Sequence, residues 1–253
     1  MFIIIAEIGK KHNLPYHCYM KKQGRTFRKV AVFDIDGTIF RSSFLIEITE
    51  ALVNEGVFPP NVRSIYVNAY RKWLHRRGNY RDFIDRVIFA FEKHIKGVPK
   101  KTYLKVAKKV VSFHKKRVYR YTRDLIGELR RRNYYLLAIS HSPKEIVDSF
   151  AKELGFNKVY GWVYEVGSER RFTGRTLYSE LIRDKARILK RAVEKNGLTL
   201  RNSVGVGDTE TDIAFLKMVD KPIAFNPNSK LYRYAKRAGW KIVVERKDVI
   251  YKK

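Results

Sequence analysis

The sequence predicts an α/β protein with a Rossmann-like core of three layers, in which a parallel sheet lies between helices, and with a helical cap inserted after the first strand. Three observations predict this fold class. From residue 120 onward, short apolar runs alternate with amphipathic stretches, which is typical of a parallel sheet with helices on both faces. One further apolar run, residues 30–33, precedes a purely helical pattern over residues 44–119. The 253 residues are enough for a core domain and a small second one.

The first predicted strand, residues 30–33, carries Asp34 and Asp36 just beyond its carboxyl end. Its continuous apolar run is typical of a buried parallel strand, and ligands bind beyond the carboxyl ends of such strands. Residues i and i+2 of an extended segment point to the same side, so we expect the two carboxylates to share one small space. Their repulsion is tolerable in a catalytic site, where a cation lies between them or one carboxyl holds a proton. The alternative is that Asp36 and Gly37 form only a turn that ends the strand.

Residues 44–119 are expected to form the cap, with about four helices lying over the strand ends. Apolar residues recur there at helical spacing, which predicts stripes that pack in a core rather than a cofactor site. The stripes comprise Ile65, Tyr66, Ala69, Tyr70, Trp73 and Leu74, then Tyr80, Phe83, Ile84, Val87, Ile88, Phe91 and Ile95, and finally Leu104, Ala107, Val111 and Val118.

The second half of the chain alternates between predicted helices and strands. The helix over residues 142–154 has the clearest boundaries. Ser142 is expected as its N-cap, with Pro143 at the first helical position and Glu145 completing a capping box. Gly155 follows its end. The other predicted elements are helices over residues 123–132 and 229–239 and strands over residues 134–140, 203–208, 221–225 and 241–245.

These elements predict a core domain of residues 29–43 and 120–253 and a cap of residues 44–119. Residues 1–28 have no sustained hydrophobic period, so we expect an N-terminal tail, and Met20 is a candidate for the true start of the chain. The apolar opening of the chain is too short to span a bilayer and lacks a basic leader and a cleavage site, so no membrane insertion is expected.

Cysteine usage favours a cytoplasmic protein, because Cys18 is the only cysteine and no disulfide framework can form. His12, His17 and Cys18 lie close in sequence but lack a further pair of ligands, so we do not expect a metal site there.

The chain is strongly basic, with 54 Lys and Arg against 25 Asp and Glu, a net charge of +29. Such a charge attracts polyanions and phosphorylated substrates. The excess is spread along the sequence, whereas a dedicated nucleic-acid module more often concentrates it on one face. Basic and aromatic residues interleave in residues 114–123 and 129–137, which keeps nucleic acid as a less favoured partner.

Three predicted strands end in polar residues: Asp34 with Asp36, Ser140, and Asp208 with Asp212 one helical turn later. The carboxyl ends of parallel strands meet at one edge of the sheet, which brings four carboxylates around one space. A hard divalent cation, by preference Mg²⁺, would relieve their repulsion. The alternative for Asp208 and Asp212 is a helix N-cap and a first-turn acid.

These residues resemble the four motifs of the haloacid dehalogenase-like hydrolases. The motifs are "FDIDGTIF", the strand ending in "IS" at Ser140, the lysine of "RDKARIL" at Lys185, and "GDTETD". Their order and spacing match from residue 30 to about residue 245. The helical insertion, residues 169–177 and residues 222–240 are similar to segments of the phosphoserine-phosphatase-like branch, which has a helical cap.

The resemblance implies a Mg²⁺-dependent phosphatase that hydrolyses a small phosphomonoester through an aspartyl-phosphate intermediate. Asp34 would be the nucleophile, and Asp36 would protonate the leaving oxygen and later deprotonate water. Ser140 and Lys185 would stabilise the phosphoryl group. The alternative for Lys185 is one more solvated lysine on a helix.

The resemblance also implies ligands for metal and substrate. Mg²⁺ would be held by Asp34, the backbone carbonyl of Asp36 and Asp208, with Asp212 beside them. Gly37, Thr38, Ser140, His141 and Lys185 are the residues expected to contact the substrate. For His141 the alternative is a loop residue that fills the space a glycine would leave.

The chain departs from the phosphoserine-phosphatase pattern around the substrate. Ser43 stands where that branch has a glutamate for the substrate amine, and Glu47 comes four residues later. His141 and Ser142 replace two glycines after Ser140. We therefore do not expect phosphoserine as the substrate. The alternative function is a nucleic-acid-binding protein or a polynucleotide-end phosphatase on the same fold, which a cap closing over the site disfavours.

Overall fold

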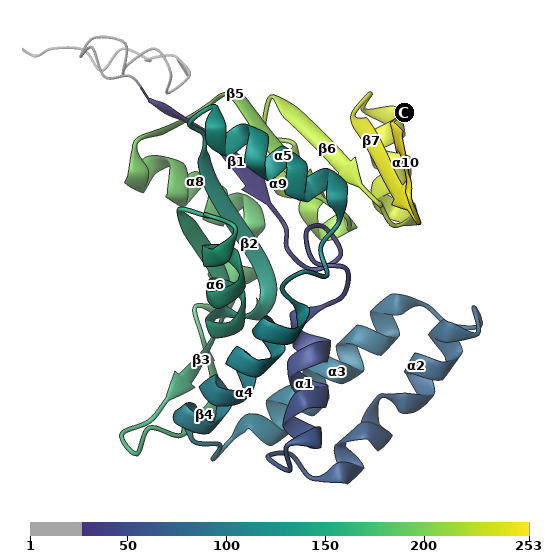
Figure 1. The fold of residues 1–253 in the computed structure, drawn as a ribbon, viewed down its shortest axis with the longest axis vertical. Helices are drawn as coiled ribbons and strands as arrows, with labels where there is room; N and C mark the ends of the chain where they lie inside the picture. Colours follow the sequence, from purple (N-terminus) through teal and green to yellow (C-terminus); the bar gives the residue numbers. More distant parts are fainter. Residues whose placement is uncertain (1–26, 253) are drawn as a thin grey trace, which may run out of the picture.

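The computed structural model describes residues 27–252 and has one eight-stranded sheet, in the order β4-β3-β2-β1-β5-β6-β7-β8 (Figure 1). All neighbours between β3 and β7 in this order are parallel, whereas the edge strands β4 and β8 are antiparallel. The predicted α/β fold is therefore confirmed, with an antiparallel strand added at each edge. The strands are β1 (Arg28–Phe33), β2 (Tyr135–Pro143), β3 (Lys158–Val166), β4 (Phe172–Leu177), β5 (Leu198–Gly207), β6 (Lys221–Phe225), β7 (Lys241–Arg246) and β8 (Val249–Lys252).

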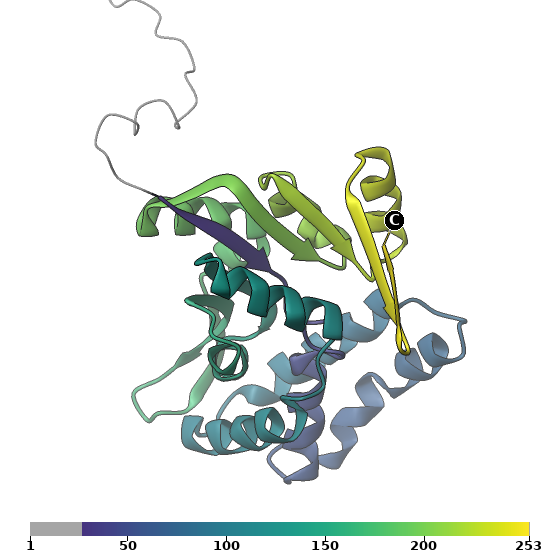
Figure 2. The ribbon, with the colours of Figure 1, turned by 45° about the horizontal axis from the view of Figure 1, so that its top comes forward.

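Helices cover both faces of the sheet, as the alternation of β1 requires. Ala31 and Phe33 belong to a buried cluster with residues of α5 and α6, while Val30 and Val32 pack in a second cluster with residues of α8, α9 and α10. Figure 2 shows the sheet between the teal helix α5 and the green helices α8 and α9. The core helices are α5 (Arg120–Arg131), α6 (Lys144–Glu153), α7 (Ser179–Arg183), α8 (Lys185–Asn196), α9 (Ile213–Leu216) and α10 (Ser229–Arg237), with a short 3₁₀ helix η3 (Glu210–Asp212) before α9.

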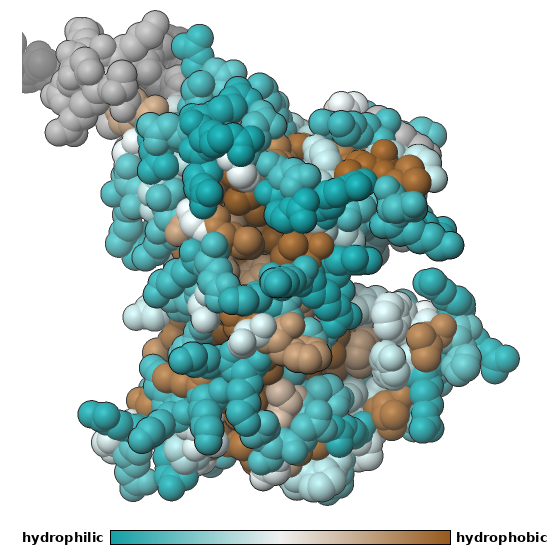
Figure 3. Space-filling view, in the orientation of Figure 1, coloured by the Kyte–Doolittle hydropathy of each residue, from teal (hydrophilic) through white to brown (hydrophobic). Residues whose placement is uncertain are grey.

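The insertion between β1 and α5 is helical, and it lies beyond the carboxyl ends of the central strands (Figure 1). Its elements are α1 (Phe44–Asn54), the 3₁₀ helix η2 (Pro60–Ile65), α2 (Val67–Leu74), α3 (Tyr80–Ile95) and α4 (Lys100–His114). Phe40 and Val118 form a bridge where the chain enters and leaves the insertion. On the other side, backbone hydrogen bonds join Gly97 and Val98 to Phe172 of β4. In Figure 3 the face is hollowed between the insertion and the strands on the right.

The expectation that all the aromatic stripes are core packing is wrong for part of the insertion. Tyr66 and Phe83 are buried, but Tyr70 is 40% exposed, Leu74 55% and Tyr80 40%. Leu104 of α4 is also exposed. The reason is that α2 packs mainly against α3 and η2, so one side of its apolar stripe is little covered by the described residues.

The predicted capping box at the start of α6 is also wrong. β2 continues through Ser142 to Pro143, which pairs with Trp162 of β3, so α6 begins only at Lys144 and has no side-chain cap. The Ser142 hydroxyl instead accepts a hydrogen bond of 3.0 Å from the backbone N–H of Leu45, in the first turn of α1. Ser43, the N-cap residue of α1, makes no side-chain cap bond. A residue of the sheet therefore caps the first helix of the insertion.

The amino-terminal boundary lies close to the prediction. β1 begins at Arg28, the last residue of the predicted tail. Residues 1–26, and with them Met20 and the cluster of His12, His17 and Cys18, lie outside the described residues. Between residues 27 and 252, no helix is long and apolar enough to cross a membrane.

The cap from Ser142 gives the first prediction. Ser142→Ala should lower the free energy of unfolding by about 0.5–2 kcal/mol, because the N–H of Leu45 loses its acceptor. Ser43→Ala is the matched control and should change stability by less than about 0.5 kcal/mol, since its side chain makes no cap bond. Urea denaturation of the three proteins measures both values, and equal effects of the two substitutions would contradict the assignment.

Candidate active site

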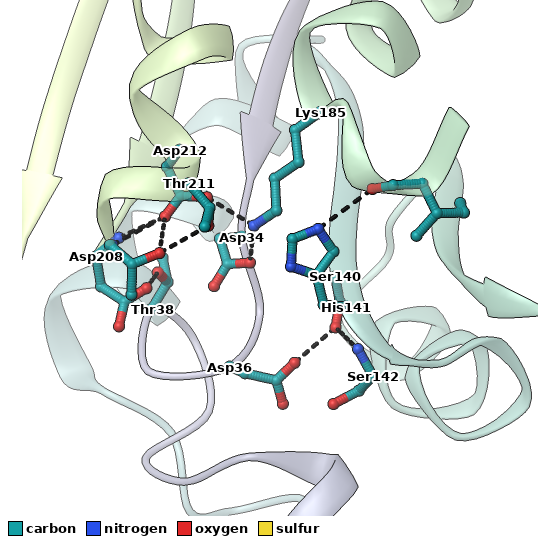
Figure 4. A network of polar contacts seen from close by, with 12 residues as sticks. Asp34, Asp36, Thr38, Ser140, His141, Ser142, Lys185, Asp208, Thr211 and Asp212 are labelled. Atoms are coloured by element: carbon teal, nitrogen blue, oxygen red, sulfur yellow. Dashed lines mark hydrogen bonds and ion pairs between the residues drawn. The ribbon is translucent and has the colours of Figure 1, made fainter. Parts of the chain in front are cut away.

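Asp34 lies at the end of β1, buried, with its backbone N–H bonded to the carbonyl of Val206. Figure 4 shows Asp34 and Asp36 bordering the same space, with their carboxylates bound to different partners. The loop after them is also a turn, because the N–H groups of Thr38, Ile39 and Phe40 all donate to the carbonyl of Ile35. The predicted pair of carboxylates and the alternative of a turn are thus both present.

The carboxylate of Asp36 joins the sheet to the insertion. One oxygen accepts a hydrogen bond of 2.6 Å from the Ser140 hydroxyl at the end of β2. The other accepts one of 2.6 Å from the N–H of Phe44, the first residue of α1. Burial raises the pKa of Asp36, while the hydrogen bonds from Ser140 and Phe44 act in the opposite direction. This carboxyl is therefore suited to hold a proton at a higher pH than an exposed aspartate.

Lys185 is the first residue of α8 and is only 2% exposed, which excludes the alternative of a solvated lysine. Its Nζ donates to Asp34 at 2.5 Å and to Asp212 at 2.6 Å. Burial by itself would lower the pKa of Lys185, but the charges of Asp212 and Asp34 outweigh it and raise the pKa. The ammonium group therefore remains charged between two carboxylates.

Asp212 organises the loop after β5. One oxygen binds Lys185, and the other accepts hydrogen bonds of 3.0 Å from the backbone N–H groups of Asp208 and Thr209, which completes a capping box with Thr209. The predicted alternative of a first-turn acid is thus correct for Asp212, whereas the N-cap is Thr209 and not Asp208. The Asp212 carboxylate also positions Lys185. The local sequence pattern predicted only the position of Asp212 in the first helical turn. It did not predict the contact with Lys185.

Asp208 has fewer partners than its neighbours. Among the described residues its carboxylate is bound only by the Thr38 hydroxyl, at 3.3 Å. Burial raises the pKa of Asp208, and the charges of Asp34 and Asp212 raise it further. The loop around it is tight: Gly37 has φ +80°, and a Cβ there would lie 2.2 Å from the Asp208 carboxylate. Only glycine suits this position.

The acidic residues fit a hard divalent cation. Asp34, Asp208 and Asp212 each offer an oxygen, and these atoms lie within 4.8 Å of one another. Lys185 faces only two of the three carboxylates, so the charge of Asp208 has no counter-ion in residues 27–252. An all-oxygen set of this kind is what Mg²⁺ prefers. The carboxylate of Asp36 points to Ser140 and α1, so only its backbone carbonyl is available for this group.

The residues expected to contact substrate have polar groups that are partly engaged within the protein. The Gly37 N–H donates to the carbonyls of Phe40 and Ser42. The Thr38 hydroxyl binds Asp208. The Ser140 hydroxyl donates to Asp36 and accepts from the N–H of Ser142, while it still borders the site in Figure 4.

His141 lies in β2 and not in a loop, and its ring borders the same space as Lys185 and Asp34 in Figure 4. Its Nε2 lies 3.2 Å from the carbonyl oxygen of Ile182, and its ring contacts the Trp162 ring edge-on. Burial lowers the pKa of His141 to about 4, and the charge of Lys185 also lowers it. The imidazole is therefore neutral near pH 7.

Tyr80, at the start of α3, lies within electrostatic reach of the carboxylates, although the sequence pattern assigned it to a core. It is 40% exposed. Partial burial raises the pKa of Tyr80, and the charges of Asp36, Asp208 and Asp34 raise it further.

Glu47 does not replace the glutamate that is absent at position 43. Its carboxylate contacts His114 at 3.1 Å and Arg117 at 2.9 Å, near the point where the chain leaves the insertion. Ser43 is itself buried. The side chains of these two residues therefore offer no free anion for a substrate ammonium group.

Comparisons with known proteins agree with this geometry. A model of the haloacid dehalogenase-like hydrolases matches residues 31–217. The chain is 25% identical over 218 residues to a Streptomyces azureus protein named inhibition of morphological differentiation protein, covering 85% of this chain and 78% of that one. It is 24% identical over 231 residues to a Neisseria meningitidis protein named histidinol-phosphatase, covering 85% and 98%. A solved structure of a phospho-aspartyl intermediate analogue of phosphoserine phosphatase gives a TM-score of 0.58 at 21% identity, covering 88% and 96%.

The unpaired charge of Asp208 gives the second prediction. In EDTA at pH 8, Asp208→Asn should raise the melting temperature by a few degrees, since about 1 kcal/mol corresponds to roughly 2–4 °C in a chain of this size. The pKa of Asp208 is raised in the folded state, so the wild-type fold gains stability as the pH falls through that pKa towards 3.8. The advantage of the variant should therefore shrink at acidic pH.

Added Mg²⁺ should raise the melting temperatures of the wild type and of Asp124→Asn, an exposed control. It should raise the melting temperature of Asp208→Asn much less. Differential scanning fluorimetry over a pH series measures these shifts. An equal response of all three proteins to Mg²⁺ would remove Asp208 from the metal site.

Proposed function

Because this chain belongs to the haloacid dehalogenase-like hydrolase family, we propose that it is a Mg²⁺-dependent phosphatase that hydrolyses a small phosphomonoester through an aspartyl-phosphate intermediate. The single observation that carries the proposal is the buried contact of Asp34 with Lys185, beside the carboxylate of Asp208. The predicted family, its phosphoserine-phosphatase-like branch and the enzyme class of a phosphatase are confirmed.

Asp34 is proposed as the nucleophile. An oxygen of its carboxylate would attack phosphorus, form the aspartyl-phosphate and break the bond to the leaving oxygen. Asp34 must be ionised for this step. Burial raises the pKa of Asp34, and the adjacent ammonium group of Lys185 is the group that opposes this shift. Lys185 would also neutralise charge on the phosphoryl group.

Asp36 is proposed as the general acid and base. Its protonated carboxyl would give a proton to the leaving oxygen, and the resulting carboxylate would take a proton from the water that hydrolyses the intermediate. The raised pKa of Asp36 favours the protonated form in the first step. Hydrogen bonds from Ser140 and from the N–H of Phe44 keep the carboxyl group in place between the two steps.

Asp34, Asp208 and the backbone carbonyl of Asp36 are proposed to hold Mg²⁺, with Asp212 beside them. When bound, the cation would neutralise charge on the phosphoryl oxygens and offset the repulsion between the carboxylates and the substrate. The loop at Gly37 would support this binding. Because Gly37 has no Cβ, the Asp208 carboxylate can lie directly against the loop.

The insertion supports a small substrate. Helices α1 to α4 lie beyond the strand ends, and Tyr80 of α3 is within electrostatic reach of the carboxylates. A polymer would have to enter beneath these helices. The aromatic residues that suggested nucleic acid are also largely used inside the protein, because Tyr134 is 1% exposed and the Tyr121 ring stacks on Phe225. Nucleic acid therefore remains the less favoured partner.

The nucleophile assignment gives the third prediction. Asp34→Asn should lower kcat by at least about 10⁴-fold, because an amide cannot form the aspartyl-phosphate. Asp124→Asn, an exposed acid on α5, is the matched control and should retain full activity. The measurement is phosphate release from a panel of amino-acid, sugar, nucleotide, histidinol and oligonucleotide phosphates, with Mg²⁺ and with EDTA.

Retention of activity in Asp34→Asn would exclude this nucleophile. Full turnover in EDTA would exclude the proposed cation. If a 3′-phosphorylated oligonucleotide were the best substrate at low and at high salt, the proposal of a small substrate would be wrong.

A further inference from the structure

The hydrogen bond of His141 defines which of its ring nitrogens carries the proton. A backbone carbonyl oxygen can only accept, so the Nε2 of His141 must donate to the carbonyl of Ile182. Burial lowers the pKa of His141 to about 4, so the ring is neutral near pH 7 and has one proton. The Nδ1 atom is therefore an unprotonated acceptor.

This acceptor is free and faces the catalytic centre. In the part of the chain that the structure describes, Nδ1 of His141 has no hydrogen-bond partner. Figure 4 shows that atom turned to the side of the ring on which Lys185 and Asp34 lie. The phosphoryl oxygens of a substrate are themselves acceptors and cannot bind it. Its partner must be a donor, and the leaving group of a phosphomonoester can supply one as a hydroxyl.

The charge around His141 favours a neutral donor over an ammonium group. Lys185 and Arg81 both act on the ring as positive charges, and the effect of Lys185 exceeds that of the nearby Asp212. The side chains of Ser43 and Glu47 offer no free anion in compensation. An ammonium group placed beside Lys185 and Arg81 would meet their positive charges, which a neutral hydroxyl does not.

The neighbour of the imidazole is an aromatic ring. Trp162 lies in edge contact with His141, and its buried Nε1 has no partner among residues 27–252. The Nδ1 of His141 therefore remains the acceptor that a ligand hydroxyl would match, and an acceptor that is left unmatched is costly.

We propose that His141 is a specificity-determining residue whose Nδ1 accepts a hydrogen bond from a hydroxyl of the leaving group, so that the preferred substrates are phosphomonoesters of polyols or sugars. The inference rests on the proposed phosphatase function and names the substrate class of the same site.

The test uses the full chain with Mg²⁺ and a matched pair of substrates, glycerol 3-phosphate and n-propyl phosphate, which differ only in hydroxyl groups. The wild type should prefer glycerol 3-phosphate in kcat/KM by roughly 10-fold, the ratio expected from one matched hydrogen bond. His141→Leu keeps an apolar body without an acceptor, so the ratio should fall to about one. His141→Asn keeps an acceptor near the position of Nδ1 and should retain most of the preference.

The ratio separates specificity from structural damage, because a distorted site would slow both substrates equally. In a third arm, 2-aminoethyl phosphate should be a poorer substrate than glycerol 3-phosphate, since its ammonium group meets the positive field at His141.

Hydrolysis of both matched substrates with equal kcat/KM, or a ratio unchanged in His141→Leu, would overturn the inference and leave the phosphatase proposal intact. A preference for 2-aminoethyl phosphate would overturn the charge argument and with it the substrate class. If the wild type hydrolysed no phosphomonoester, including p-nitrophenyl phosphate, both proposals would fail together.

Discussion

The site is organised around a buried charge cluster in which the ammonium group of Lys185 lies 2.5 Å from Asp34 and 2.6 Å from Asp212, with all three side chains at most 6% exposed. Removing such groups from water costs several kcal/mol for each ion, so each is tolerated only because the others neutralise it. The three residues come from the end of β1, the start of α8 and the loop after β5, and the cluster therefore determines how these elements meet. Within residues 27–252 Asp208 forms no ion pair of this kind, and this is the reason for proposing that the cluster also holds a cation.

A second constraint joins the insertion to the sheet. One hydrophobic cluster runs from Phe33 of β1 through the helices of the insertion, so the insertion has no separate core. Its first helix receives its N-terminal acceptors from the core, with Asp36 binding the N–H of Phe44 and Ser142 that of Leu45. The carboxyl proposed to transfer protons is therefore also a cap of α1. A movement of this helix would change the hydrogen bonding of Asp36 and hence its affinity for a proton.

Selectivity in this arrangement comes from a few groups and not from the high net charge. The charge of +29 attracts any anion, and attraction of this kind increases capture without choosing among substrates. Choice requires groups within hydrogen-bond reach of the leaving group. Here the proposed group is the imidazole acceptor of His141, while Ser43 and Glu47 offer no free anion. We therefore infer that the site recognises a neutral hydrogen-bond donor at His141 and not an ammonium group at position 43.

The sequence by itself determined the α/β class, the strand that ends at Asp34 and the four ordered motifs, because strand alternation and helical period are local properties of the chain. It did not reveal the half-buried hairpin of β3 and β4 or the short strand β8. Only the tertiary structure decided that Ser142 caps α1 instead of α6, since its partner Leu45 lies 97 residues away. It also decided that Tyr80 comes within electrostatic reach of the carboxylates and that Asp212 serves both a capping box and Lys185. A periodic pattern shows which residues share a face, but what covers that face depends on elements distant in the chain.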